Sequence, residues 1–136
     1  MRKILTALGT TGLMAGLMLG GPAQAQAVEA AAWECPTKSV CFYTGVGGTG
    51  QRCAWPGAQN DPDWRSGDLK CSWAGSASVG SLRVMPNAAG SVSYYPNANY
   101  GGGRTCLTSG AAGIEISFKA EPRILSHKTS SSGCSV

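Results

Sequence analysis

A short aromatic hairpin in the second half of the chain constrains the fold more than any other segment. Residues 92–95 have the β-branched and aromatic composition of a strand, and the Pro-Asn-Ala-Asn sequence that follows favours a turn. Tyr95 and Tyr100 are spaced so that one ring can fold over the other, and Gly102 can adopt the positive φ that closes the loop. The pattern Tyr-x-x-x-x-Tyr-x-Gly therefore predicts a tightly folded β-hairpin.

An earlier segment repeats part of this hairpin pattern. Both segments contain an aromatic pair, a closing glycine and an arginine at the same spacing. These are residues 42–43, Gly50 and Arg52 in the first half and residues 94–95, Gly102 and Arg104 in the second half. The second aromatic is not repeated, because Gly48 stands in the place of Tyr100. Residues 79–84 and 124–128 add a weaker match, each with a serine near the start of an expected closing strand. We predict two related halves; chance similarity of Gly- and Ser-rich sequence is the alternative.

The sequence around these hairpins has the residue pattern of an all-β protein. Short apolar segments are broken at close intervals by Gly, Pro, Asn and Asp. The expected strands are residues 40–43, 52–55, 81–85, 92–95 and 114–118. Residues 114–118 alternate apolar and polar side chains, as a half-buried strand does. Residues 59–67 and 86–90 are expected to form loops, and residues 129–133 a flexible tail.

The N-terminal 27 residues have the features of a secretory signal peptide. Arg2 and Lys3 precede an apolar, uncharged run, and two small-x-small cleavage patterns end at Ala25 and Ala27. The apolar run is short for a membrane span, although an uncleaved N-terminal anchor is the alternative. We therefore expect a signal peptide at residues 1–27 and one secreted, extracellular domain at residues 28–136, with its core at about 35–128 and a tail at 129–136.

The charge pattern excludes several classes of partner. Eleven Lys and Arg residues stand against seven Asp and Glu residues, and two of the basic residues belong to the signal peptide. The remaining basic residues are scattered rather than clustered, so the sequence offers no reason to expect nucleic acid or an anionic membrane as a partner. We expect a monomer that needs no cofactor.

All six cysteines follow the signal peptide: Cys35, Cys41, Cys53, Cys71, Cys106 and Cys134. An even number of cysteines in a small exported domain indicates a disulfide framework, and the sequence alone does not choose among the possible pairings. Proximity suggests Cys35–Cys41 and Cys53–Cys71, which leaves Cys106–Cys134. A metal site is the rival interpretation. Paired Cys-x-x-Cys spacing is absent and the chain has one histidine, so we expect no metal.

Together, these motifs resemble a family of secreted actinobacterial peptidase inhibitors, the type of the Streptomyces metalloproteinase inhibitor. The resemblance is carried by the segments 35–45, 61–64, 71–73 and 94–102, and it covers roughly residues 35–128. It implies a βγ-crystallin-like sandwich of two Greek-key motifs. It also implies a protein that is not an enzyme and that blocks extracellular zinc peptidases of the thermolysin type through a rigid, substrate-like loop.

The resemblance also implies an inhibitory loop. In that family the reactive bond follows a Thr-Cys pair just past the second hairpin, and the matching residues here are Arg104, Thr105, Cys106, Leu107 and Thr108. A leucine after the bond suits the apolar pocket of thermolysin-type enzymes, and the Cys106 carbonyl would face the zinc. This chain departs from the family at residues 109–113, which lack the second cysteine of that loop. The alternative is that Cys106 serves only as a cystine and Leu107 as a core residue.

The remaining candidate sites are weaker. The positions where βγ-crystallins bind calcium hold Glu121 as their sole acidic residue, so we expect no calcium site. Residues 60–63 fit an Asx-type turn. The four tryptophans, Trp33, Trp55, Trp64 and Trp73, are expected mainly in the core rather than on a sugar-binding platform. We expect His127 to be an exposed or capping residue of the last strand, with no catalytic serine or carboxylate partner.

We therefore predict a secreted peptidase inhibitor. The alternative, from another class, is an extracellular binding module or antimicrobial toxin-like module that uses the same scaffold to contact cell walls, glycans or competing microbes. An assay of the mature protein against thermolysin separates the two hypotheses.

Overall fold

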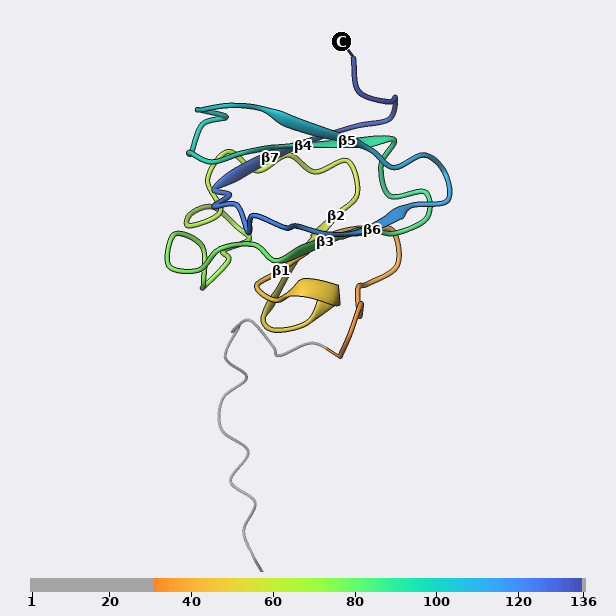
Figure 1. Ribbon diagram of the computed structural model, residues 1–136. Coiled ribbons are helices and arrows are strands. Elements are labelled where there is room, and N and C mark those ends of the chain that lie inside the picture. The colour runs from red at the N-terminus through yellow and green to blue at the C-terminus, as the bar shows by residue number, and fades with distance from the viewer. Residues whose placement is uncertain (1–30, 136) are drawn as a thin grey trace, which may run out of the picture.

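The computed structural model describes residues 31–135, so the predicted signal peptide at 1–27 lies outside the described residues. Two antiparallel sheets face each other across a core (Figure 1). The elements are β1 (Ser39–Tyr43), the 3₁₀ turn η1 (Val46–Gly48), β2 (Arg52–Pro56), β3 (Ser81–Val84), β4 (Ser91–Tyr95), β5 (Thr105–Thr108), β6 (Ile114–Ser117) and β7 (Ser126–Ser130). The first sheet has the strand order β2-β1-β3-β6 and the second the order β5-β4-β7. The predicted all-β sandwich is confirmed.

The two halves share one strand register. The corresponding pairs are Tyr43↔Ser81 and Cys41↔Arg83 in the first sheet, and Tyr95↔Ser126 and Ser93↔Lys128 in the second. In a strand the side chains alternate between the two faces, so equal register places equivalent residues on the same face of each sheet. The internal repeat expected from the sequence is therefore confirmed at the level of strand pairing.

A buried serine ties each hairpin to its closing strand. In both halves its hydroxyl donates to one carbonyl of the hairpin and accepts from one hairpin N–H. The groups are Gly45 O (2.6 Å) and Gly48 N (2.9 Å) around Ser81, and Asn97 O (2.6 Å) and Tyr100 N (3.1 Å) around Ser126. Both serines are fully buried, so these bonds satisfy polar groups that water does not reach.

The hairpin predicted at residues 92–102 is confirmed in detail. The rings of Tyr95 and Tyr100 meet edge to face, with 5.5 Å between their centroids. Gly102 has a φ of 84°, and a Cβ there would lie 2.5 Å from the Pro96 ring. Glycine is therefore required both for the backbone conformation and for space.

Each half contributes to the sheet of the other half. β6 belongs to the second half but pairs with β3 in the first sheet. The corresponding part of the first half, residues 57–80, contains no strand. It contacts β7 of the second sheet through a bridge between Asp61 and His127 and through further hydrogen bonds to His127 and Thr129. The two sheets are thus interlocked by segments that cross between the halves.

The core between the sheets is aromatic. Trp55, Trp64 and Trp73 are buried, as predicted, and they pack with Phe42 and with valines from both sheets. Trp33 differs, because it is only half-buried and lies outside this cluster. Burial of three indole rings in so small a domain supplies a large share of its apolar contact area.

All three disulfides suggested by proximity are present: Cys35–Cys41, Cys53–Cys71 and Cys106–Cys134. They fasten the N-terminal segment, the loop at residues 57–80 and the C-terminal tail to strands. Among the described residues, no helix is long and apolar enough to cross a membrane.

Two boundaries differ from the sequence prediction. The segment Thr105–Thr108 forms strand β5, where a loop was expected. β7 continues through Ser130, two residues into the segment expected to be a flexible tail. In both cases the strand is paired with β4, so a tertiary contact supplies order that the short polar sequence does not indicate.

Candidate functional site

The segment that the family resemblance marked as inhibitory lies at an edge of the second sheet. β5 pairs with β4 on one side, and among residues 31–135 no strand pairs with its other side. Arg104, Thr105 and Thr108 are exposed, whereas Cys106 and Leu107 are half-buried. The Cys106–Leu107 bond is therefore part of an extended, accessible edge strand.

The two residues that flank this bond face opposite sides of the sheet. Leu107 pairs with the fully buried Val92 and packs against the core, so it lies on the inner face. Cys106 pairs with Ser93 and is bonded to Cys134, so it lies on the outer face. The inner position of Leu107 agrees with the structural alternative that the sequence left open.

Hydrogen bonds hold the segment after β5, where the chain lacks the family's second loop cysteine. Ser109 is buried; its N–H donates to Gly90 O (2.9 Å) and its hydroxyl donates to Ala89 O. Asn87 N donates to Ala111 O (3.1 Å). These bonds to residues 87–90 restrain the Gly- and Ala-rich segment. No local pattern in the sequence indicates them.

The C-terminal tail restrains β5 from the outside. Besides the disulfide to Cys106, Cys134 N donates to Thr108 Oγ1 (3.2 Å), and the Arg104 guanidinium donates to Ser135 O (3.1 Å). The edge strand is thus held at its middle and near both ends. A strand fixed in this way loses little conformational entropy on binding.

His127 is in the core, so the expectation that it is exposed was wrong. It is fully buried in β7 and faces Phe42, Trp55 and Trp64. Its Nδ1 accepts from Trp64 Nε1 (2.9 Å), so the ring is neutral with its proton on Nε2, which points at Gln59 O (3.1 Å). Burial lowers the pKa of His127 to about 4. A buried, neutral imidazole engaged on both nitrogens serves packing rather than catalysis.

The acidic turn beside His127 has a structural role. Asp61 Oδ1 accepts from Asp63 N (2.9 Å), which is the Asx-type turn predicted for residues 60–63. Asp61 is buried, and its Oδ2 accepts from Trp55 Nε1 (2.8 Å). Within residues 31–135 no group of three His, Cys, Asp or Glu side chains is placed to hold a metal ion.

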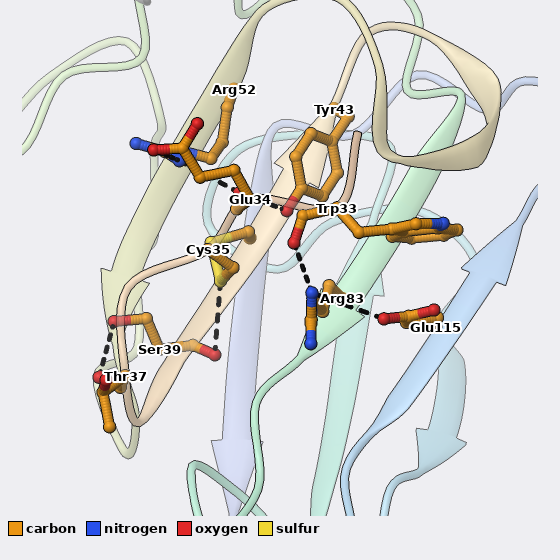
Figure 2. The surroundings of a disulfide bond; sticks show 10 residues. Trp33, Glu34, Cys35, Thr37, Ser39, Tyr43, Arg52, Arg83 and Glu115 are labelled. Atoms are coloured by element: carbon orange, nitrogen blue, oxygen red, sulfur yellow. Dashed lines mark hydrogen bonds and ion pairs between the residues drawn. A yellow bond between two sulfur atoms is a disulfide. The ribbon is translucent and has the colours of Figure 1, made fainter. Parts of the chain in front are cut away.

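An N-terminal strap, residues 33–35, lies on the outer face of the first sheet (Figure 2). Arg83 donates to Trp33 O, and the carbonyl of Glu34 accepts from Tyr43 Oη (2.6 Å) and from Arg52 Nη1 (2.9 Å). Burial raises the pKa of Tyr43 to about 12, so its hydroxyl stays a donor at neutral pH. The strap was not predicted from the sequence.

The strap explains why Gly48 replaces the second hairpin aromatic. The Trp33 ring meets Tyr43 edge to face, with 6.0 Å between centroids, as Tyr100 meets Tyr95 in the other half. A Cβ at Gly48 would lie 2.6 Å from the Trp33 ring. The aromatic lid of the first hairpin is therefore supplied by the strap.

Comparison with solved structures agrees with this architecture. One match is described as "Evolution of the eye lens beta-gamma-crystallin domain fold"; it is 16% identical, covers 76% of this chain and 95% of its own, and has a TM-score of 0.51. At that identity the likeness shows the fold alone. The comparison with curated proteins gave no match.

The fold and the disulfides define the class: a βγ-crystallin-like sandwich of two Greek-key motifs. The model of peptidase inhibitor family I36 matches residues 28–108, and the chain belongs to that family. Membership makes the protein a peptidase inhibitor rather than an enzyme, with a peptidase as its partner. The match includes the whole of β5.

Proposed function

We propose that this protein is a secreted, monomeric inhibitor of thermolysin-type zinc peptidases and that it acts through the Arg104–Thr108 segment. The observation that carries the proposal is the edge position of β5, whose middle is held by the Cys106–Cys134 bridge. An extended strand with one unpaired edge can add to the edge of a sheet in a partner, with main-chain hydrogen bonds on the new side. The peptidase would receive the segment as it receives an extended substrate.

In this proposal the Cys106 carbonyl points at the catalytic zinc and Leu107 enters the apolar pocket beyond it. Zinc in such enzymes polarises a carbonyl as a Lewis acid and activates a bound water. Leu107 lies partly against the core, so its insertion requires β5 to lift at its free edge. The disulfide and the tail contacts would keep the rest of the segment in place.

The test is inhibition of thermolysin by the protein purified from the medium of an expressing host. We expect one-to-one inhibition and, on long incubation, slow cleavage that yields a new N-terminus at Leu107 when the sample is reduced and sequenced. Cleavage must be read after reduction because Cys134 holds the two pieces together. Absence of inhibition at micromolar protein, or cleavage confined to other bonds, would overturn the proposal.

Export is tested by the mass of the secreted protein. We expect it to begin at Gln26 or Val28, because the two signal-cleavage patterns end at Ala25 and Ala27. Three disulfides should make the intact protein lighter than its reduced form by six hydrogens. An intact mass that includes residues 1–24, or free thiols in the native protein, would contradict this expectation.

A further inference from the structure

The outer face of the second sheet carries the same donors as the face that binds the strap. Because the two halves share one register, Tyr95 corresponds to Tyr43 and Lys128 corresponds to Arg83. Arg104 precedes Thr105, the partner of Tyr94, and therefore lies opposite Tyr95, as Arg52 lies opposite Tyr43. In the first half these donors hold two consecutive main-chain carbonyls of the strap. The second half therefore presents a cation, a phenol and a second cation in an arrangement already used to bind an extended peptide.

On the second face, the described residues leave these donors less fully engaged than on the first. A hollow of about 240 Å³ lies there, lined by Ser93, Tyr95, Arg104 and Lys128 among others. Arg104 donates to Ser135 O, just as Arg52 donates to Glu34 O in the first half. Within the described chain, Tyr95 Oη has no hydrogen-bond partner, and neither Lys128 nor Arg104 has a carboxylate partner.

Charge favours an acidic occupant. Residues 86–114 and 122–135 contain no Asp or Glu, so the strands of the second sheet carry no acid, and Arg104 and Lys128 have no carboxylate partner among residues 31–135. In the first half, the carboxylate of Glu34 lies 3.9 Å from Arg52. Lys128 is held over the Tyr100 ring, 4.2 Å from its centroid, so its ammonium is positioned at the hollow.

We propose that this hollow binds an extended, carboxylate-bearing peptide segment of a protein partner. The segment runs beside the tail, whose Ser135 O already accepts from Arg104: one main-chain carbonyl of the segment accepts from Tyr95 Oη, and its carboxylate pairs with Lys128 and Arg104. Because Tyr100 already covers Tyr95, the segment needs no aromatic residue in the place of Trp33. The hollow adjoins the proposed inhibitory segment, since Arg104 and Cys106 line it, but the binding proposed here does not involve the Cys106–Leu107 bond.

The test uses the purified protein and a short peptide with the central glutamate of the strap, acetyl-Ala-Ala-Glu-Ala-amide, followed by amide NMR spectra. The peptide is titrated up to roughly 10 mM, because so few contacts are expected to give only weak affinity. We expect saturable shifts centred on Ser93, Arg104 and Lys128. The same peptide with Gln for Glu should bind about tenfold more weakly, since it lacks the charge-assisted pair. No peptidase is present, so the result does not depend on the inhibitory function.

Three variants complete the test. Tyr95→Phe keeps the ring and removes the hydroxyl, and Lys128→Gln removes the charge; each should weaken binding by about tenfold with an otherwise unchanged spectrum. Lys119→Gln, an equal charge change at an exposed residue outside the hollow, should leave binding unchanged. Shifts that do not saturate, that centre elsewhere, or that are the same in the parent, Tyr95→Phe and Lys128→Gln proteins would overturn the proposal.

Discussion

Acidification should destabilise this protein well before its carboxylates are protonated. The pKa of His127 is about 4 in the folded protein, whereas an unfolded chain gives histidine its ordinary value of about 6.5. Between these values the unfolded chain binds the extra proton, so the stability that neutral His127 contributes is complete above about pH 6.5 and is lost as the pH falls. We expect a loss of about 2 kcal/mol at pH 5 and about 3 kcal/mol at pH 4.

The physical cause is burial, which disfavours the charged imidazole, and the hydrogen bond from Trp64 also opposes protonation of Nδ1. Protonated His127 has no acceptor nitrogen, so its Nδ1–H would face the N–H of Trp64 in a fully buried site. Urea unfolding at a series of pH values measures the effect. His127→Gln is the matched control, because an amide can still accept from Trp64 and donate to Gln59 O but does not titrate.

The difference between the parent and His127→Gln isolates the histidine from every other titrating group. The parent should lose stability from pH 7 to pH 5, and the variant should keep nearly constant stability over that interval. Equal pH profiles for the two proteins would show that His127 does not titrate in the buried position that the structure gives it.

Leu107→Asp should weaken inhibition of thermolysin by about a hundredfold or more. A leucine side chain in an apolar pocket contributes roughly 2–3 kcal/mol, and a carboxylate there adds a desolvation cost. Inhibition constants measured together with melting temperatures give the result. The expected outcome is a large loss of inhibition by a protein that remains folded under the assay conditions.

Ile114→Asp is the matched control for the fold. Ile114 is also a half-buried aliphatic residue on an edge strand, and it pairs with the buried Val84 as Leu107 pairs with Val92. The two substitutions should cost similar stability, but only Leu107→Asp should weaken inhibition by the factor given above. If Leu107→Asp fails to fold, the milder Leu107→Ala still serves, with an expected loss of about tenfold. Equal inhibition by the parent and by folded Leu107 variants would remove this bond from the mechanism.

The parts of the fold that depend on local pattern were predictable from the sequence. The Tyr95 hairpin and the repeated closing serines are encoded by residue spacing, and five of the seven strands have apolar or β-branched runs. The disulfides followed from proximity along the chain. Each of these features is marked by a residue pattern or by a cysteine spacing that can be read directly along the chain.

The features that were missed depend on contacts between distant segments. His127 occupies the place that Leu82 has in the first half, and it is buried because the irregular loop at residues 57–80 brings Trp64 against it. β5 is ordered by β4, by the tail and by the bonds of Ser109. The role of Trp33 depends on the strap, which no periodicity marks.

The bridge between Cys106 and Cys134 has a consequence for the lifetime of the inhibitor. Hydrolysis after Cys106 would divide the chain into two pieces, and the bridge would keep them in one covalent molecule. The second piece also holds β6 and β7, which remain paired with β3 and β4 of the first. The new amine would therefore stay beside the carboxyl group from which it was cut, at a high effective concentration. Peptide-bond resynthesis then becomes an intramolecular reaction, and a nicked molecule remains a reservoir of the intact inhibitor.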